Sequence, residues 1–184
     1  MKQLARLLAA SCAFGLSMSA FPSEATALET PEAKTEAGDA AMAAGLDMFQ
    51  AFGFKTLKPG QYLWRDLPGN AGQERLVISL TEQLAYLYRG DELMAVTTIS
   101  TGNDERPTPT GIFAVRGKTP FHRSRKYDNA PMPFTQFIDE YGIALHGGFN
   151  PGYPASHGCI RLPQAFAKKL YGVTGIGTPV YIGA

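Results

Sequence analysis

Residues 75–99 read RLVISLTEQLAYLYRGDELMAVTTI, and they contain three runs of β-forming residues separated by short polar segments. The first two runs, 75–80 and 84–88, combine Val, Ile, Leu and Tyr in strand-length blocks. The segment 89–92 carries Gly and Asp at its centre, which is typical of a turn, and leads into the third run at 93–99. The stretch therefore predicts three successive β-strands.

The remainder of the chain continues this texture. Further strands are predicted at 111–116, 143–146 and 180–182, and 20 Gly with 13 Pro indicate many turns. One helix is predicted at 164–171, with Pro163 in its first turn and a glycine past its end. The sequence thus predicts one mainly β domain over 55–184, with a short helix after the cysteine motif described below.

The N-terminus has the pattern of an export signal. A positively charged start, an apolar run at 7–18 and small residues at 25–27 predict a signal peptide covering 1–27. The apolar run is too short to span a bilayer, so we expect membrane contact only through this signal and a periplasmic location for the mature protein. Two alternatives are cleavage nearer Ala20 and a lipoprotein signal that lipidates Cys12.

Residues 28–54 separate the signal from the domain. Residues 28–40 are rich in Ala, Glu, Thr and Pro, a composition that predicts a linker. Residues 40–52 can form a short helix, for which Asp39 is the expected N-cap. The net charge of the whole chain is +1, which gives no indication of nucleic-acid binding.

Cys159 is the one cysteine outside the predicted signal peptide. An exported protein with a single thiol has no internal disulfide partner, so the thiol pairs between chains, is inert, or is reactive. Nearby glycines, two histidines and Arg161 favour the reactive interpretation, because a thiolate requires positive charge or N–H donors. We therefore interpret Cys159 as a nucleophile.

Acyl transfer by a thiol also needs a base and donors for an oxyanion. His146 ends a predicted strand and is the expected base, with the carbonyl of Gly147 as a candidate acceptor for its Nδ1–H. The N–H groups around His157 and Gly158, with that of the cysteine itself, are candidate oxyanion donors.

Two neighbours of this motif are expected to contact substrate. Arg161 can bind a substrate carboxylate or support the loop, and Ser156 is the second candidate for substrate binding. A different class of chemistry uses the same residues: His122, His146, His157 and Cys159 are all possible zinc ligands. Their spacing lacks the motifs that fix metal geometry, so the metal-free cysteine mechanism without a cofactor is preferred.

Several segments together resemble the bacterial L,D-transpeptidases. These are HG at 146–147 followed by SHGCIRL at 156–162, STG at 100–102, TPTGIF at 108–113, and the stretch 122–134. The resemblance runs from about residue 75 to the C-terminus, and the cysteine motif is its most specific part. It implies an L,D-transpeptidase-like β-sandwich.

The resemblance also implies an activity. In this family a cysteine attacks the diaminopimelate carbonyl of a peptidoglycan stem peptide, expels D-alanine and passes the acyl group to an amine. The acceptor is another stem, a D-amino acid or the N-terminus of an outer-membrane protein. Carried over, Cys159 is the nucleophile and carbapenem target, and His146 the base. Hydrolysis by the same cysteine, as a carboxypeptidase or endopeptidase, is the first alternative; a zinc hydrolase and an inactive wall-binding module are more distant ones.

Overall fold

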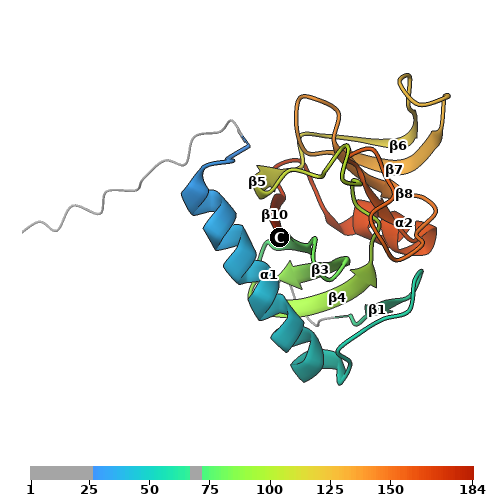
Figure 1. Ribbon diagram of the computed structural model, residues 1–184. Coiled ribbons are helices and arrows are strands. Elements are labelled where there is room, and N and C mark those ends of the chain that lie inside the picture. The colour runs from blue at the N-terminus through green and yellow to red at the C-terminus, as the bar shows by residue number, and fades with distance from the viewer. Residues whose placement is uncertain (1–26, 67–71) are drawn as a thin grey trace, which may run out of the picture.

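The computed structural model describes residues 27–66 and 72–184, which form two β-sheets and two α-helices (Figure 1). The larger sheet has six strands in the order β1-β4-β3-β2-β10-β5, and the smaller has four in the order β6-β7-β8-β9. The chain is therefore mainly β, as predicted. The strands of the larger sheet are β1 (Tyr62–Trp64), β2 (Glu74–Ser79), β3 (Leu84–Arg89), β4 (Glu92–Thr98), β5 (Gly111–Ala114) and β10 (Pro179–Gly183). Those of the smaller sheet are β6 (Gly117–Arg123), β7 (Pro131–Phe137), β8 (Ala144–Gly147) and β9 (Ile160–Leu162).

The three strands predicted from residues 75–99 are confirmed as β2, β3 and β4, which pair antiparallel in sequence order. Their side chains are buried on both faces of the sheet. Leu76 and Leu87 point into a core shared with Phe166 of the C-terminal helix, whereas Val77 and Tyr86 point into a second core under the N-terminal helix. A sheet covered on both faces explains why these strands read as nearly continuous apolar runs.

The N-terminal helix α1 (Pro31–Phe52) overturns the linker prediction for 28–40. The helix begins after Thr30, whose hydroxyl accepts a hydrogen bond from the first turn, and ends at Gly53 with φ 75°. The predicted cap, Asp39, lies inside the helix. Neither helix in the described residues is apolar over a length sufficient to cross a membrane. Apart from Ala27, the predicted signal peptide lies outside the described residues.

The helix predicted at 40–52 is confirmed as the second half of α1, and alanine explains why its first half was not predicted. The buried face of α1 consists almost entirely of small residues at helical spacing, namely Ala33, Ala37, Ala41, Ala44 and Met48. Alanine is the strongest helix former, and its small side chain lets the helix backbone approach a sheet closely. Residues 28–40 contain few large apolar residues, so their composition suggested that the segment buries little surface. Figure 1 shows α1 lying along the outer face of the six-stranded sheet.

The approach of α1 to the sheet is closest at Gly183, where a Cβ would lie 2.5 Å from the carbonyl oxygen of Ala37. Gly183→Ala should therefore lower the free energy of unfolding by about 1–3 kcal/mol, the usual cost of overpacking. Gly38→Ala is the matched control, because a Cβ at Gly38 meets nothing within 4 Å. It should stabilise the helix by about 0.5–1 kcal/mol. Urea denaturation measures both, and equal effects of the two substitutions would contradict this packing.

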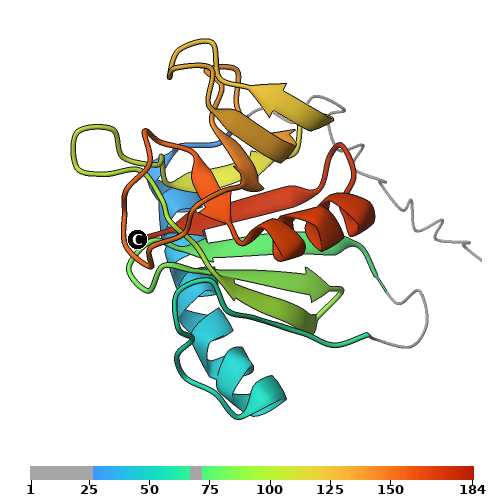
Figure 2. The same cartoon turned by 90° about the vertical axis from the view of Figure 1, so that its right-hand side faces the viewer.

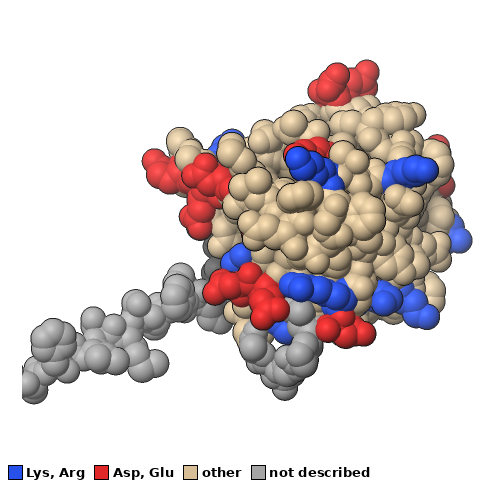
Figure 3. Space-filling model, turned by 90° about the horizontal axis from the view of Figure 1, so that it is seen from below, with Lys and Arg blue, Asp and Glu red and all other residues tan. Residues whose placement is uncertain are grey.

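The smaller sheet continues into α2 (Gln164–Val173), which packs on β7 and β8 (Figure 2). This confirms the helix predicted after the cysteine motif, although Gly172 lies within the helix rather than past its end. Strands β8 and β9 pair in parallel, so the segments that carry the two predicted catalytic residues lie side by side. On the face seen from below, acidic and basic side chains are intermingled (Figure 3).

Candidate active site

His146 and Cys159 meet at one edge of the smaller sheet. In the parallel ladder, His146 of β8 lies opposite Arg161 of β9, and Cys159 immediately precedes β9. Both residues line one open cavity of about 1400 Å³, which extends from the cysteine loop to the hairpin formed by β6 and β7. The pairing of β8 with β9 thus brings together two residues that are distant in the sequence.

The Cys159 thiol is partly buried, and its Sγ lies 3.7 Å from the carbonyl oxygen of Gly142. Burial raises the pKa of this thiol, and the nearby Asp139 charge also raises it. The backbone N–H of Ala144 and the Arg161 charge oppose this shift but do not outweigh it. The resting thiol is therefore protonated at neutral pH, so a base is required to generate the nucleophile.

His146 has the properties of that base. Its side chain is 7 % exposed, and Nδ1 lies 3.0 Å from the carbonyl oxygen of Gly147. Because the carbonyl can only accept, Nδ1 carries the proton and Nε2 holds the free lone pair. Burial lowers the pKa of His146, and the charges of Arg161 and His122 lower it further. The imidazole is consequently neutral at pH 7. The described hydrogen bonds include none between His146 and Cys159.

Ser156 supports the cysteine loop from inside. It is 2 % exposed; its Oγ accepts from the Gly158 N–H at 3.2 Å and donates to the carbonyl of Cys159. These contacts indicate that Ser156 supports the loop, but the residue also lines the cavity, so its substrate-binding role stays a prediction. They also occupy the Gly158 N–H. Of the predicted oxyanion donors, the N–H groups of His157 and Cys159 have no hydrogen-bond partner among the described residues.

Ser156→Ala should therefore act on the loop rather than on substrate affinity. Removing the hydroxyl leaves the buried N–H of Gly158 unpaired, which should cost about 1–3 kcal/mol of unfolding free energy. We expect kcat to fall while KM for a stem peptide stays within twofold. Urea denaturation and steady-state kinetics test this, with Thr35→Ala, an exposed hydroxyl on α1, as the control. A raised KM with unchanged stability would instead support a direct contact between Ser156 and substrate.

Gly158 itself adopts φ 110°, and a Cβ there would lie 2.7 Å from Cδ1 of Ile143. Its carbonyl oxygen accepts a 2.8 Å hydrogen bond from Thr108 Oγ1, which in turn accepts from the Gly102 N–H at 2.9 Å. Thr108 thus joins two of the other segments that resembled the transpeptidase family, 100–102 and 108–113, to the cysteine loop. The sequence alone gave no sign of this role.

The β6–β7 hairpin is connected to the same loop through aromatic stacking. The ring of His157 lies 4.3 Å from that of Tyr127, with an angle of 10° between their planes. Nη1 of Arg106 donates to the Tyr127 hydroxyl at 3.0 Å. Tyr127 and Arg106 were not identified from sequence, because they are far from Cys159 along the chain and only the fold brings them to it.

Arg161 projects beside the base. Its Cγ lies 3.5 Å from the position of a Cβ on Gly148, and the residue lines the cavity. The four candidate zinc ligands are used differently. His122 packs edge-on against Phe137, and no group of three or more His, Cys, Asp or Glu within 27–66 and 72–184 could hold a metal ion.

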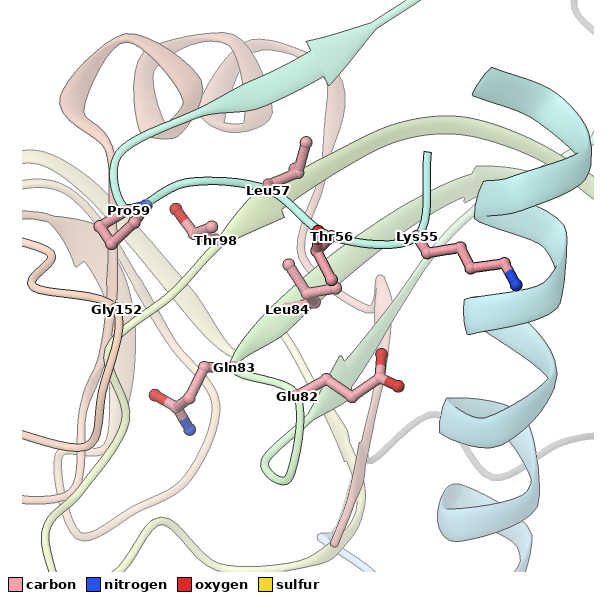
Figure 4. A pocket seen from close by; sticks show the side chains of 9 residues that line it. All are labelled: Lys55, Thr56, Leu57, Pro59, Glu82, Gln83, Leu84, Thr98 and Gly152. Carbon is pink, nitrogen blue, oxygen red and sulfur yellow. The ribbon is translucent and has the colours of Figure 1, made fainter. Parts of the chain in front are cut away.

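A second, smaller cavity of about 270 Å³ lies between the loop after α1 and the start of β3 (Figure 4). It is lined by Lys55 and Glu82, whose side chains Figure 4 shows at its α1 side, and by Gly152 at the opposite side. The lining includes no cysteine or histidine.

Comparison with known proteins agrees with this geometry. The family model of the L,D-transpeptidase catalytic domain, YkuD, matches residues 73–182. No curated protein sequence gives a significant match. Among solved structures, an L,D-transpeptidase from Xylanimonas cellulosilytica is 28% identical with a TM-score of 0.55, covering 65% of this chain and 64% of its own.

Two further structures show the same fold at lower identity. An L,D-transpeptidase from Mycobacterium smegmatis is 20% identical with a TM-score of 0.57, covering 61% of this chain and 59% of its own. A transpeptidase solved in complex with imipenem is 22% identical with a TM-score of 0.55, and the match covers 62% of this chain and 59% of that protein. This chain thus spans about three fifths of the length of these relatives.

Proposed function

Because this chain belongs to the L,D-transpeptidase family, whose catalytic-domain model matches more than half of it, we propose that it is a peptidoglycan L,D-transpeptidase with Cys159 as nucleophile. The observation that carries the proposal is the parallel β8–β9 ladder, which brings Cys159 and a neutral His146 to the wall of one cavity. A protonated thiol and a neutral imidazole with a free Nε2 are the reactant states that base-assisted thiol attack requires.

The proposed reaction has two acyl transfers. Nε2 of His146 removes the thiol proton as Cys159 Sγ attacks the diaminopimelate carbonyl of a tetrapeptide stem. The tetrahedral intermediate collapses to a thioester, the peptide C–N bond breaks, and the imidazolium returns its proton to the leaving D-alanine amine. An acceptor amine then attacks the thioester carbonyl and loses a proton to His146. The C–S bond breaks, a new peptide bond remains, and the imidazolium returns the proton to Cys159 Sγ.

The oxyanion of each tetrahedral intermediate needs donors directed at the cavity. The N–H groups of Cys159 and His157 are the candidates that remain after Ser156 binds the Gly158 N–H. Preorganised backbone donors of this kind typically contribute about 10²–10³-fold in rate each. Arg161, which lines the same cavity, can bind a carboxylate of the stem peptide.

Acceptors for the second step are another stem, a D-amino acid or the N-terminal amine of an outer-membrane protein. Water as acceptor would make the protein a carboxypeptidase or endopeptidase with the same nucleophile. The predicted signal peptide 1–27 supports a periplasmic location for the proposed chemistry, with the stem peptides.

The test is mass spectrometry of products from a disaccharide-tetrapeptide, with and without a D-amino acid, for the mature protein and Cys159→Ala. Cross-linked dimers or exchanged stems that disappear in the variant would support transpeptidation. Cysteine-dependent trimming to the tripeptide alone would establish the hydrolytic alternative. Turnover that persists in the variant, or stoichiometric zinc in active protein, would overturn the cysteine mechanism.

A further inference from the structure

The cavity beside Cys159 carries charge of one sign. Its lining includes five cationic side chains and no Asp or Glu, although the chain as a whole has 17 Lys and Arg against 16 Asp and Glu. The cationic residues are Arg106, Arg123, Arg125, Lys126 and Arg161. The face seen in Figure 3, by contrast, has acidic and basic groups side by side. The cavity lining is therefore more uniformly positive than that face.

None of these cations forms an ion pair with another of the described residues. The two ion pairs of the described residues, Arg65–Glu92 and Arg89–Glu74, lie elsewhere in the fold. The cavity arginines that have polar partners use uncharged ones, since Arg106 binds a tyrosine hydroxyl and Arg123 binds the backbone carbonyl of Asn129. The nearby carboxylates of Asp104, Glu105, Asp128 and Asp139 do not line the cavity, although the Asp139 charge acts on the Cys159 thiol. An anionic ligand would supply the missing negative charge.

Most of this charge is on the β6–β7 hairpin, which faces the cysteine loop across the cavity. Arg125 and Lys126 are exposed at its tip, and the Tyr127–His157 stack connects the hairpin to the catalytic loop. The cations are thus held opposite Cys159 by contacts that fix the hairpin. A concave surface with charge of one sign raises the local concentration of oppositely charged ligands, and guanidinium groups match carboxylates in shape.

We propose that this cationic wall makes the protein selective for stem peptides with free carboxyl groups over those in which the glutamate and diaminopimelate carboxyls are amidated. The inference rests on the proposed function and specifies the substrate of that same site. Amidation removes negative charge from the peptide while changing its shape little, so charge recognition is the property that would distinguish the two forms. A neutral or acidic cavity would not discriminate in this direction.

The direct test is calorimetric binding of the free and the doubly amidated tetrapeptide to Cys159→Ala, which binds without turnover. We expect the free peptide to bind about 3- to 30-fold more tightly, the effect of a few partly exposed ion pairs. The difference should shrink as NaCl rises from 0.1 M to 1 M, since the Debye length falls from about 10 Å to about 3 Å.

Variants that replace cationic side chains with neutral ones test which residues cause the preference for the free peptide. Arg125→Gln/Lys126→Gln, made in the same background, should lose most of the preference by weakening the free peptide and leaving the amidated one unchanged. Lys34→Gln/Lys58→Gln removes the same charge from exposed sites on and after α1 and should keep the preference. All four side chains are exposed, and an unchanged circular dichroism spectrum verifies folding.

Equal affinity for the two peptides, or the same loss in both double variants, would overturn the inference. The proposed function is judged separately by cysteine-dependent turnover of the free tetrapeptide. Turnover with no preference removes the selectivity and leaves the transpeptidase. Absence of both binding and turnover for either peptide overturns both.

Discussion

Replacing Cys159 with alanine is expected to abolish covalent modification by a carbapenem and to reduce stem-peptide turnover by roughly 10³-fold or more, as for other lost nucleophiles. In the proposed mechanism no second thiol substitutes for it, because the other cysteine, Cys12, lies in the predicted signal peptide. Intact-protein mass spectrometry after incubation with imipenem measures the first effect as loss of the mass increase, and product analysis measures the second.

Cys159→Ser is the matched control for shape, because it preserves a small polar side chain next to Gly158. Its hydroxyl is a far weaker nucleophile, so it should remain folded and inactive. A carbapenem adduct that persists in Cys159→Ala would show that another residue is acylated, and the nucleophile assignment would be wrong.

Replacing His146 with alanine is expected to slow acylation by roughly 10²–10⁴-fold, the usual contribution of a positioned general base. The reason is the protonated resting state of the thiol, whose pKa burial raises from its ordinary value of 9.0. Without the imidazole, attack must wait for the small thiolate fraction. Stopped-flow measurement of carbapenem acylation gives the rate directly. A loss below tenfold would transfer the base role to His157.

The pH dependence provides a second measurement of the same base. Burial lowers the pKa of His146 from 6.5, so the imidazole remains neutral and active to a lower pH than a free histidine. Acylation by the unmodified protein should therefore fall only when the pH drops below about 6.5. In His146→Ala the acylation rate should instead rise with pH towards the raised pKa of the thiol. The difference in rate between the variant and the unmodified protein should therefore become smaller at alkaline pH. An acid limb above pH 6.5 in the unmodified protein would contradict this assignment.

Strands with strong local patterns were predictable from sequence, and those with weak ones were not. Residues 84–88 and 93–99 are apolar blocks bounded by turns, and both are strands. Strands β6 and β7 contain three prolines between them and mostly exposed or half-buried side chains, so propensity argued against them. They pair nevertheless, because tertiary contacts outweigh local preference.

The candidate site divides in the same way. Cys159 and His146 stand in short motifs whose residue types suggest their chemistry, and the structure brings both to one cavity. Ser156 belongs to the same motif, but only its burial showed that it supports the loop. The positions of Arg106 and Tyr127 beside the cysteine loop depend entirely on folding, because the two residues come from loops that are distant in the sequence. Sequence motifs therefore suggested the candidate reacting groups, and the fold showed what surrounds them.

The position of β10 has a consequence for the order in which the chain folds. This strand pairs with both β2 and β5, with Val180 opposite Leu76 on one side and Phe113 on the other. It therefore joins strands that are far from it along the sequence. Such non-local closure is slow, because the entropy of a long loop is lost before the contacts form. Until Pro179–Gly183 is available, β5 has no strand to join it to the sheet. Ribosomal synthesis therefore delivers β10 after both of the strands that it joins, and a chain stopped before residue 179 should remain partly unfolded.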